Sequence, residues 1–311
     1  MTSRDVGSRI PRDANMNSQL QRRMNRRYAT VFLFLAPAFL GLLAFRVYPV
    51  VLAVWESMFT ATYGSAKVGM SFVGFENYQL LWEDIVFWRS VKATALLTIF
   101  INPIQISLAL GLALLLQRTS RFIGPIRTLF LLPVGVALPI ATIVWGLMLN
   151  PNKGLVNSFL AVFSIPPQPF LTSETQAIWS IILIASWKGV SFWMLFLLAG
   201  LQDIPKIFYE AARIDGARLW HQIRFITLPL LRRPLLFVIV ADTAANFVLF
   251  VPMFILTQGG PRNSTNVLMY EAYRSGFAFQ DYGRSMAIVT ILTVVILIII
   301  GIQIKYFRPK H

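Results

Sequence analysis

Two ionisable side chains lie near the middle of apolar runs of this sequence, where an uncompensated charge is costly. Lys188 follows Trp187 in the run 176–200, and Asp242 lies within the run 234–256. An ionisable group at bilayer depth costs about 2.5–3.5 kcal/mol on insertion scales, so it needs a partner or a water-filled cavity. Polar groups among aromatic rings suit a sugar, whose hydroxyl groups need hydrogen bonds and whose C–H faces stack on rings. The alternative is that Lys188 and Asp242 pair with each other, or with a partner subunit, and hold helices together.

Further polar and aromatic residues accompany these two charges at helical spacing. Asp242 and Asn246 are four residues apart, so they project from one face of a helix, which Phe250 continues. Phe192 lies one turn beyond Lys188. A lysine in such a cavity permits an anionic sugar derivative or a sugar phosphate as the ligand.

The residue types needed for several other chemistries are scarce. The chain has no cysteine, and its two histidines are His221 and His311, so thiolate or histidine-based catalysis and metal binding are not expected. No Gly-x-x-x-x-Gly-Lys-Ser/Thr loop occurs, so the chain does not cradle nucleotide phosphates in that manner. A membrane-embedded enzyme would need clustered nucleophiles, bases or metal ligands at membrane depth. The sequence offers Asp242 and little else there, so it does not favour this function.

The elements that position these residues are long apolar segments. With 56% hydrophobic residues among 311, the sequence indicates an integral membrane protein. Each run approaches or exceeds the roughly 20 residues that span a bilayer. We therefore predict an all-α integral membrane fold with six transmembrane helices and both termini on one side. The predicted spans are 30–54, 90–116, 125–149, 176–200, 234–256 and 284–304.

Orientation follows from the placement of lysine and arginine, which concentrate on the cytoplasmic side. Most of the 28 basic residues lie in the tail 1–28, near 118–127, in the segment 201–233 and after residue 304. This distribution also argues against nucleic acid as the partner of a chain with a net charge of +15. We divide the chain into a basic cytoplasmic tail, 1–28, and a six-helix domain, 29–311, which includes the cytoplasmic segment 201–233.

The third predicted span contains Leu132-Pro133-Val134-Gly135 and Pro139. Proline removes a backbone donor and clashes with the preceding turn, so we expect a bend or a broken segment here. Such a bend is either a hinge for gating or a static kink.

A polar island interrupts the apolar runs between 201 and 233. Asp203 and Pro205 supply a helix start signal, and Gly216 supplies a stop. A second short helix is predicted from Arg218 to Phe225, with Leu228-Pro229 ending it. The pattern predicts a helix, a glycine turn and a helix, in which small side chains and one charge suit insertion into a partner's groove. A solvated loop that only fixes topology is the alternative.

The motif in this island resembles a known family signature. Glu210-Ala211-Ala212, then Asp215-Gly216-Ala217, then Ile226-x-Leu228-Pro229 match the EAA signature of the membrane subunits of binding-protein-dependent ABC importers. The Asp-Gly-Ala version resembles the carbohydrate branch, of the maltose and glycerol-phosphate type. This resemblance implies the type I importer permease fold.

The resemblance also implies partners and a mechanism. We expect a second homologous permease subunit, two ATP-binding subunits and a periplasmic or lipid-anchored solute-binding protein, in the inner membrane of a bacterium. ATP and Mg²⁺ are expected on the partner ATPase subunits, with no cofactor, metal or catalysis on this chain. ATP-driven closure would move the permease between inward- and outward-facing states, and the coupling residues are Glu210, Ala211, Ala212, Asp215, Gly216, Ala217, Leu228 and Pro229.

The resemblance favours the substrate interpretation of the polar residues at membrane depth. Asp242 and Asn246 precede a Gly-Gly-Pro turn where maltose-type subunits carry sugar-contacting side chains, and Gly189 and Phe192 lie on a contacting part of the neighbouring helix. The chain departs from that pattern at Lys188, Asp242 and Ala245. The predicted substrate-binding residues are Trp187, Lys188, Gly189, Phe192, Asp242, Asn246 and Phe250. An ion-coupled carrier or channel that uses Lys188 and Asp242 is the alternative function.

Overall fold

The computed structural model describes residues 30–60, 71–117 and 122–307. Within these ranges the chain is almost entirely helical, with one pair of two-residue antiparallel strands. The predicted basic tail, 1–28, lies outside the described residues. The chain divides into two units, one ending at Ala53 and the other beginning at Val54.

The elements are numbered along the chain. They are η1 (Leu43–Val47), α2 (Tyr48–Glu56), β1 (Phe59–Thr60), β2 (Ser71–Phe72), α3 (Glu76–Glu83), α4 (Ile85–Leu116), α5 (Ile123–Gly135), α6 (Leu138–Met148), α7 (Leu155–Val162), η2 (Phe170–Thr172), α8 (Ala177–Gln202), α9 (Lys206–Ile214), α10 (Leu219–Gln222), η3 (Ile223–Thr227), α11 (Leu228–Leu230), α12 (Arg232–Phe247), η4 (Met253–Thr257), α13 (Leu268–Tyr273), η5 (Arg274–Ala278) and α14 (Tyr282–Phe307).

Four helices of the described chain are long and apolar enough to cross a membrane, and they agree with four predicted spans. They are Thr30–Glu56, which contains η1 and α2, and then α4, α8 and α14. The helix Thr30–Glu56 has no buried residue in its most apolar stretch. Its apolar side chains, such as Phe34 and Phe45, are exposed.

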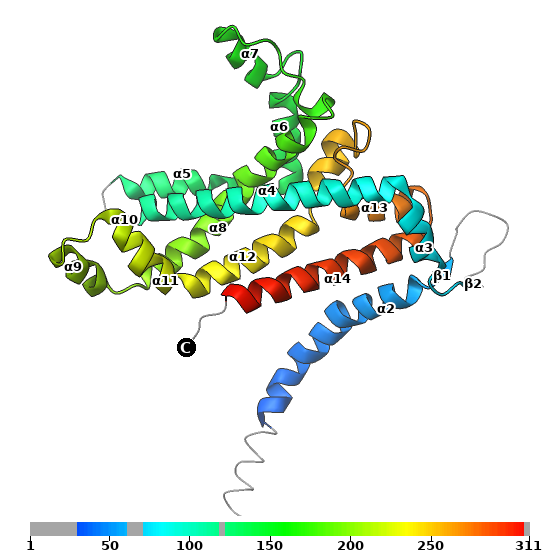
Figure 1. Ribbon diagram of the computed structural model, residues 1–311, viewed down its shortest axis with the longest axis horizontal. Coiled ribbons are helices and arrows are strands. Elements are labelled where there is room, and N and C mark those ends of the chain that lie inside the picture. The colour runs from blue at the N-terminus through cyan, green and yellow to red at the C-terminus, as the bar shows by residue number, and fades with distance from the viewer. Residues whose placement is uncertain (1–29, 61–70, 118–121, 308–311) are drawn as a thin grey trace, which may run out of the picture. The chain divides into compact units, whose positions relative to one another are not determined.

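The third predicted span is broken where its prolines and glycine predicted a bend. It consists of α5 and α6, and their axes differ by 99°. Pro133 lies in the last turn of α5, and Pro139 lies at the start of α6. Figure 1 shows α6 leaving the direction of the bundle and continuing toward α7. The expectation of a broken segment is therefore confirmed.

The fifth predicted span, 234–256, is shorter and interrupted. α12 has 16 residues and ends at Phe247, and the chain turns before helical structure resumes ahead of η4. Pro252 lies immediately before η4, where its missing N–H is tolerated because the first turn of a helix has no acceptor for it. A Gln258-Gly259-Gly260-Pro261 turn follows, with Gln258 and Gly259 at positive φ, so this turn is placed as the sequence predicted.

The core lies where α4 runs along α8 and where α12 covers both helices. One large cluster joins Ala109 and Ala113 of α4 to Met194 and Leu197 of α8, all of them fully buried. Alanines on α4 let the two helices approach closely, as small residues do at helix contacts in membranes. α14 packs on α12 and α13 to complete the bundle (Figure 1).

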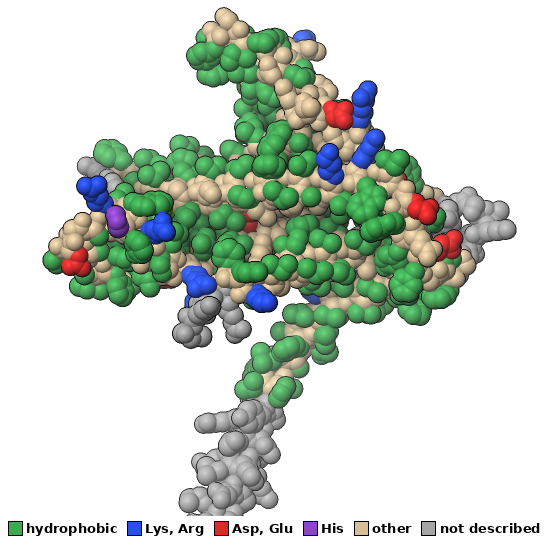
Figure 2. Space-filling view, viewed as in Figure 1, with side chains coloured by type: hydrophobic (Ala, Val, Ile, Leu, Met, Phe, Trp, Pro, Cys, Tyr) green, Lys and Arg blue, Asp and Glu red, His purple; other side chains and the backbone are tan. Residues whose placement is uncertain are grey.

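The surface of the bundle is strongly apolar. Figure 2 shows hydrophobic side chains along the length of the helices, with basic side chains at the end that α9 and α10 form and also near α13. The apolar surface suits helices that lie in hydrocarbon.

Candidate functional site

The segment between α8 and α12 folds as the helix, glycine turn and helix that the sequence predicted. α9 contains Glu210, Ala211 and Ala212, and it ends at Ile214. Its start differs from the expectation, because Pro205 is the N-cap residue itself and no side chain caps the helix. Asp203 instead ends α8.

A glycine in left-handed conformation reverses the chain after α9. Gly216 has φ of +76°, a conformation that residues with a Cβ rarely adopt. The Ala217 amide donates to the Ala212 carbonyl at 2.8 Å, and the Gly216 amide donates to the Arg213 carbonyl at 3.1 Å. This is the hydrogen-bond pattern that closes a helix on a C-terminal glycine.

The predicted helix end at Leu228-Pro229 is wrong. Helical structure continues from α10 through the π-turn η3 into α11, which begins at Leu228. The Leu228 amide donates to the Ile223 carbonyl, five residues back, and Pro229 follows at the start of α11. The wider π-turn accommodates the proline, whose missing N–H would have broken a regular ladder.

Contacts within the segment hold it in one shape. The Tyr209 hydroxyl and the Thr227 hydroxyl are 3.0 Å apart and join α9 to η3. The Gln222 side-chain amide donates to the Ala217 carbonyl at 2.9 Å. Ile204 and Leu231 flank the segment and are buried in the core cluster of α4 and α8. Movement of this segment would therefore be transmitted to the bundle.

The outer face of the segment is apolar and exposed. Ile214 is 88% exposed and Trp220 is 65% exposed, and Phe208 and Leu219 are also exposed. Glu210 is exposed and has no hydrogen-bond or ion-pair partner in the described part of the chain. Exposed apolar side chains grouped around an unpaired charge mark an interaction surface. We call α9, α10 and the turn between them the coupling segment.

The second group of predicted residues lies within the bundle. Asp242 is 1% exposed, and one of its carboxylate oxygens accepts from the Trp193 indole and from the Asn246 amide. The other oxygen of Asp242 is buried and has no partner among the described residues. A carboxylate in this condition is unusual, because buried polar groups are normally hydrogen-bonded.

Asn246 extends this arrangement to α4. Its amide donates to Asn102 at 2.7 Å and to Gln105 at 3.3 Å. Asn102 and Gln303 also donate to the hydroxyl of Thr243, at 3.1 and 2.8 Å. We call this set the buried polar cluster: Asn102, Gln105, Asp242, Thr243, Asn246 and Gln303.

Sequence reasoning missed the members of this cluster outside α12. Asn102 and Gln105 are polar residues inside the apolar run 90–116, and Gln303 is polar inside 284–304. Their position in predicted spans was the available signal. Which helix each of them faces depends on packing between distant segments.

Gly189 joins α8 to the same cluster. A Cβ at this position would lie 2.5 Å from the Gln105 side-chain amide. The absence of a side chain therefore allows Gln105 to lie against α8 while it accepts from Asn246. The structure brings Gly189, Asp242 and Asn246 into one neighbourhood.

Lys188 lies elsewhere and makes no pair with Asp242. Its ammonium donates to the backbone carbonyls of Pro133 at 3.0 Å, Val134 at 3.3 Å and Val136. Asp242 accepts from Trp193 and Asn246 instead. The alternative in which these two charges neutralise each other does not describe this structure.

A groove of about 760 Å³ lies beside Lys188, between α4, α5, α6 and α8. Its walls include Trp145, Trp179 and Trp187, and the Ser186 hydroxyl on the wall is buried without a partner in the described residues. The rings of Trp145 and Trp187 meet edge to face, with centroids 6.0 Å apart. The lining of this groove is therefore aromatic and mostly apolar, and the Ser186 hydroxyl oxygen is not exposed in it.

The remaining predicted aromatic residues lie apart from this groove. Phe192 is 40% exposed and contacts the rings of Trp193 and Phe196. Phe250 stacks on Tyr273, with centroids 5.6 Å apart. The seven predicted substrate residues are thus distributed over several surfaces of this one chain.

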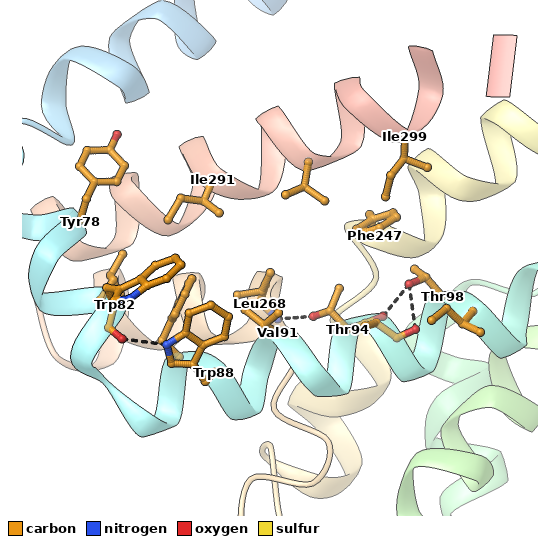
Figure 3. Close-up of a pocket in the computed structure, with 15 residues that line it drawn as sticks. Tyr78, Trp82, Trp88, Val91, Thr94, Thr98, Phe247, Leu268, Ile291 and Ile299 are labelled. Atoms are coloured by element: carbon orange, nitrogen blue, oxygen red, sulfur yellow. Dashed lines mark hydrogen bonds between the residues drawn. The ribbon is translucent and has the colours of Figure 1, made fainter. Parts of the chain in front are cut away.

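A second groove, of about 580 Å³, is almost wholly apolar (Figure 3). Trp82, Trp88, Phe247 and Ile291 line it, with no charged side chain among the lining residues. Its threonines are already bonded, since Thr94 accepts from the Leu268 amide at 2.8 Å and donates to a carbonyl of its own helix. This groove offers little to a hydroxylated ligand.

An ionic cluster joins the N-terminal ends of α4 and α14 to α13. Arg284 donates to Asp84 and, at 3.0 Å, to Glu271, which also pairs with Arg274 at 2.7 Å. Burial raises the pKa of Asp84, but hydrogen bonds from Arg284 and the Val86 amide outweigh burial and hold this pKa below its usual value. This carboxylate has a cationic partner, unlike Asp242.

The helical bundle and its apolar surface define an integral membrane protein, and the coupling segment lies at one end of the bundle as an exposed surface. The chain belongs to the family of binding-protein-dependent transport system inner membrane components, which it matches over residues 105–310. It is an integral membrane permease subunit of an ABC importer. The predicted family and the all-α permease fold are confirmed.

Relatives of known role resemble the chain over nearly its whole length. It is 32% identical to the sn-glycerol-3-phosphate transport system permease protein UgpA of Agrobacterium fabrum, over 90% of this chain and 94% of that protein. It is also 32% identical to the trehalose/maltose transport system permease protein MalF of Thermococcus litoralis, over 94% of this chain and 99% of that protein. These matches agree with the maltose and glycerol-phosphate branch that the motif indicated.

A solved structure shares the fold. A chain of a bacterial alginate ABC transporter, in complex with an alginate pentasaccharide-bound periplasmic protein, superposes with a TM-score of 0.79. The match covers 92% of this chain and 96% of that chain at 22% sequence identity. At this identity the likeness concerns the fold.

Proposed function

We propose that this chain carries a sugar or sugar derivative inward across the bacterial inner membrane, as one half of a two-subunit permease. The proposal is supported by relatives named for sn-glycerol-3-phosphate and for trehalose and maltose. A second homologous permease subunit, two ATP-binding subunits and a periplasmic or lipid-anchored solute-binding protein complete the importer. Both termini of this chain lie in the cytoplasm.

The single observation that carries the proposal is the form of the coupling segment. A hydrogen bond joins its α9 to η3, it is continuous with the bundle core, and its free face carries exposed apolar side chains beside charged ones. An ATPase groove closed on this face would move α8 and α12 through Ile204 and Leu231. The ATPase subunits bind the ATP and Mg²⁺, and Glu210 supplies a fixed charge in the contact.

Transport follows an alternating-access cycle. A partner shifts a conformational equilibrium only through contacts that differ between the two states. We assign those contacts to Glu210, Ala211, Ala212 and the Asp215-Gly216-Ala217 turn, which ATP-dependent closure of the ATPase dimer would displace. Leu228 and Pro229 carry the movement into α12.

The substrate path combines aromatic surfaces with polar groups at membrane depth. Trp187 and Phe192 on α8 and Phe250 after α12 supply apolar faces, while Asp242 and Asn246 supply hydrogen bonds to hydroxyl groups. Gly189 leaves room for this arrangement. Lys188, which the sequence also predicted to contact substrate, has carbonyl partners for its three N–H donors in this structure, so we leave it out of this path.

The test is ATP hydrolysis by the importer reconstituted in liposomes with its ATPase, second permease subunit and binding protein. We expect the binding protein loaded with the true cargo to stimulate hydrolysis at least about fivefold. A panel of neutral sugars, sugar phosphates and acidic sugars separates the two charge classes of cargo. A complex lacking this chain is the control, and it should show no stimulation.

Two outcomes would overturn the proposal. One is the absence of stimulation by every sugar, with stimulation by a different class of solute. The other is uptake by the chain alone, driven by a proton or sodium gradient without ATP, which would favour the ion-coupled carrier.

A further inference from the structure

The break between α5 and α6 leaves backbone carbonyls at the end of α5 without helical donors. The last four carbonyls of any α-helix lack partners within the helix, and here the chain turns by 99° before α6 begins. One such carbonyl, that of Pro133, accepts from the Val136 amide at 3.4 Å. In an apolar setting the remaining carbonyls need donors from another element.

Lys188 supplies donors to part of this turn from α8. Its ammonium contacts the carbonyls of Pro133, Val134 and Val136, which uses all three of its N–H groups. The C-terminal end of a helix carries partial negative charge, so a cation at this place is stabilising. This place at the C-terminal end of α5 explains how the half-buried Lys188 is tolerated in a membrane helix without a carboxylate as its partner.

The residue before Lys188 holds the other half of the broken span. Trp187 meets Trp145 of α6 edge to face, with ring centroids 6.0 Å apart. Two consecutive residues of α8 therefore contact both sides of the break. The same region forms part of the wall of the 760 Å³ groove, through Pro133, Trp145 and Trp187.

We propose that Lys188 is a positioning residue: with Trp187 it fixes the angle between α5 and α6, and it thereby shapes the tryptophan-lined groove without contacting the cargo. The effect of Lys188 on transport rests on the proposed function. Its effect on the angle between α5 and α6 does not. Lys188 acts through the backbone carbonyls of α5. Its removal should therefore affect neutral and anionic cargo equally.

The bend is measured first, on the full chain in lipid nanodiscs. Because the sequence has no cysteine, the double variant Ile126→Cys with Leu147→Cys places one spin label on α5 and one on α6. We expect Lys188→Met to broaden the distance distribution between the labels at least about twofold, and Lys188→Arg to restore it. Lys92→Met, which removes an exposed lysine of α4 with no bonded partner in the described chain, is the control and should change nothing.

If Lys188→Met gives no monodisperse protein, Lys188→Gln provides the same test, since it keeps two N–H donors without the charge. An intermediate width is expected for Lys188→Gln. An unchanged distribution in either variant overturns the proposal, whatever the chain transports.

The second measurement is uptake by the reconstituted importer with one neutral and one anionic sugar that it accepts. We expect Lys188→Met to lower uptake of both sugars by the same factor, about tenfold, and Lys188→Arg to keep at least about half of the wild-type rate. Loss of the anionic sugar alone would overturn the proposal and assign Lys188 to the cargo. If no sugar is taken up by the wild type, the proposed function fails while the spin-label result still decides the role of Lys188.

Discussion

The coupling segment and the buried polar cluster carry the two family-derived predictions, and they are built in opposite ways. The coupling segment satisfies its backbone internally and leaves apolar side chains and Glu210 exposed. In the buried polar cluster nearly every polar atom is bonded inside the subunit, and Asn246 and Asp242 face α4 and α8. We propose that another protein completes the first region, whereas most polar atoms of the second are bonded within this chain.

This difference teaches where each function is encoded. An interface with a partner is visible in one chain as unsatisfied surface. A transport path that lies between two subunits is visible only in part, because each chain supplies one wall of it. Two side-chain oxygens of the cluster, one of Asp242 and one of Gln303, are buried without a partner in the described chain, and the cluster remains open there.

The largest effect is expected where the surface is incomplete. Glu210→Lys reverses the one acidic charge on α9, which we expect to place a repulsive charge in the ATPase groove and to lower ATP-dependent uptake below about a tenth of wild type. Asp203→Lys makes the same reversal at the end of α8, where a cation is favourable, so uptake should stay within about twofold. Equal uptake by the two variants would show that the charge of Glu210 is no more important for coupling than that of Asp203.

A smaller but substantial effect is expected inside the cluster from Gly189→Ala. The new Cβ would lie 2.5 Å from the Gln105 amide and displace this side chain from Asn246, and we expect about a fivefold loss of uptake. Adding Gln105→Ala should relieve the clash, so the double variant should not show the sum of the two single effects. Gly111→Ala on α4, where a Cβ meets open space, is the matched control.

The next prediction concerns stability at Asp242. Asp242→Ala leaves the Trp193 indole N–H buried without an acceptor, and we expect the free energy of unfolding to fall by about 1–3 kcal/mol. Asp242→Asn keeps an acceptor oxygen and removes the buried charge, so its unfolding temperature should equal or exceed that of wild type. An unfolding temperature of Asp242→Asn clearly below that of wild type would contradict this expectation.

The smallest effect is expected at Asp84, the carboxylate that has a cationic partner. Because its pKa is lowered in the folded chain, it stabilises the fold above the ordinary value of 3.8, and this stability is lost as the pH falls below that value. The difference in unfolding temperature between wild type and Asp84→Asn should therefore be constant from about pH 5 to 8 and shrink toward about pH 3. A difference that changes near neutral pH would contradict this account.

Local signals explain which structural predictions succeeded. The long apolar helices, the break at Pro133 and the glycine turn at Gly216 depend on residues close together in the sequence. The π-turn that accommodates Pro229, and the interruption after Phe247, depend on which backbone hydrogen bonds replace the regular i to i−4 pattern of the α-helix. Neither has a sequence pattern of comparable strength.

Side-chain partners were largely beyond sequence reasoning. Lys188 bonds to carbonyls more than fifty residues earlier, and Asp242 bonds to Trp193, 49 residues away. Spacing along one helix gives the face on which a residue lies, but not the element opposite that face. The sequence therefore predicted that Lys188 and Asp242 need partners, and only the packed bundle identifies them.

The most direct test of the central claim is protection of the coupling segment by an ATPase. Ala211→Cys introduces a single cysteine on the exposed face of α9 in a chain that has none. We predict that a maleimide reagent labels this cysteine at least about tenfold more slowly in the assembled importer than in the isolated chain. Phe163→Cys, an exposed position after α7, should label at the same rate in both. Equal labelling of Ala211→Cys in the two preparations would contradict the account.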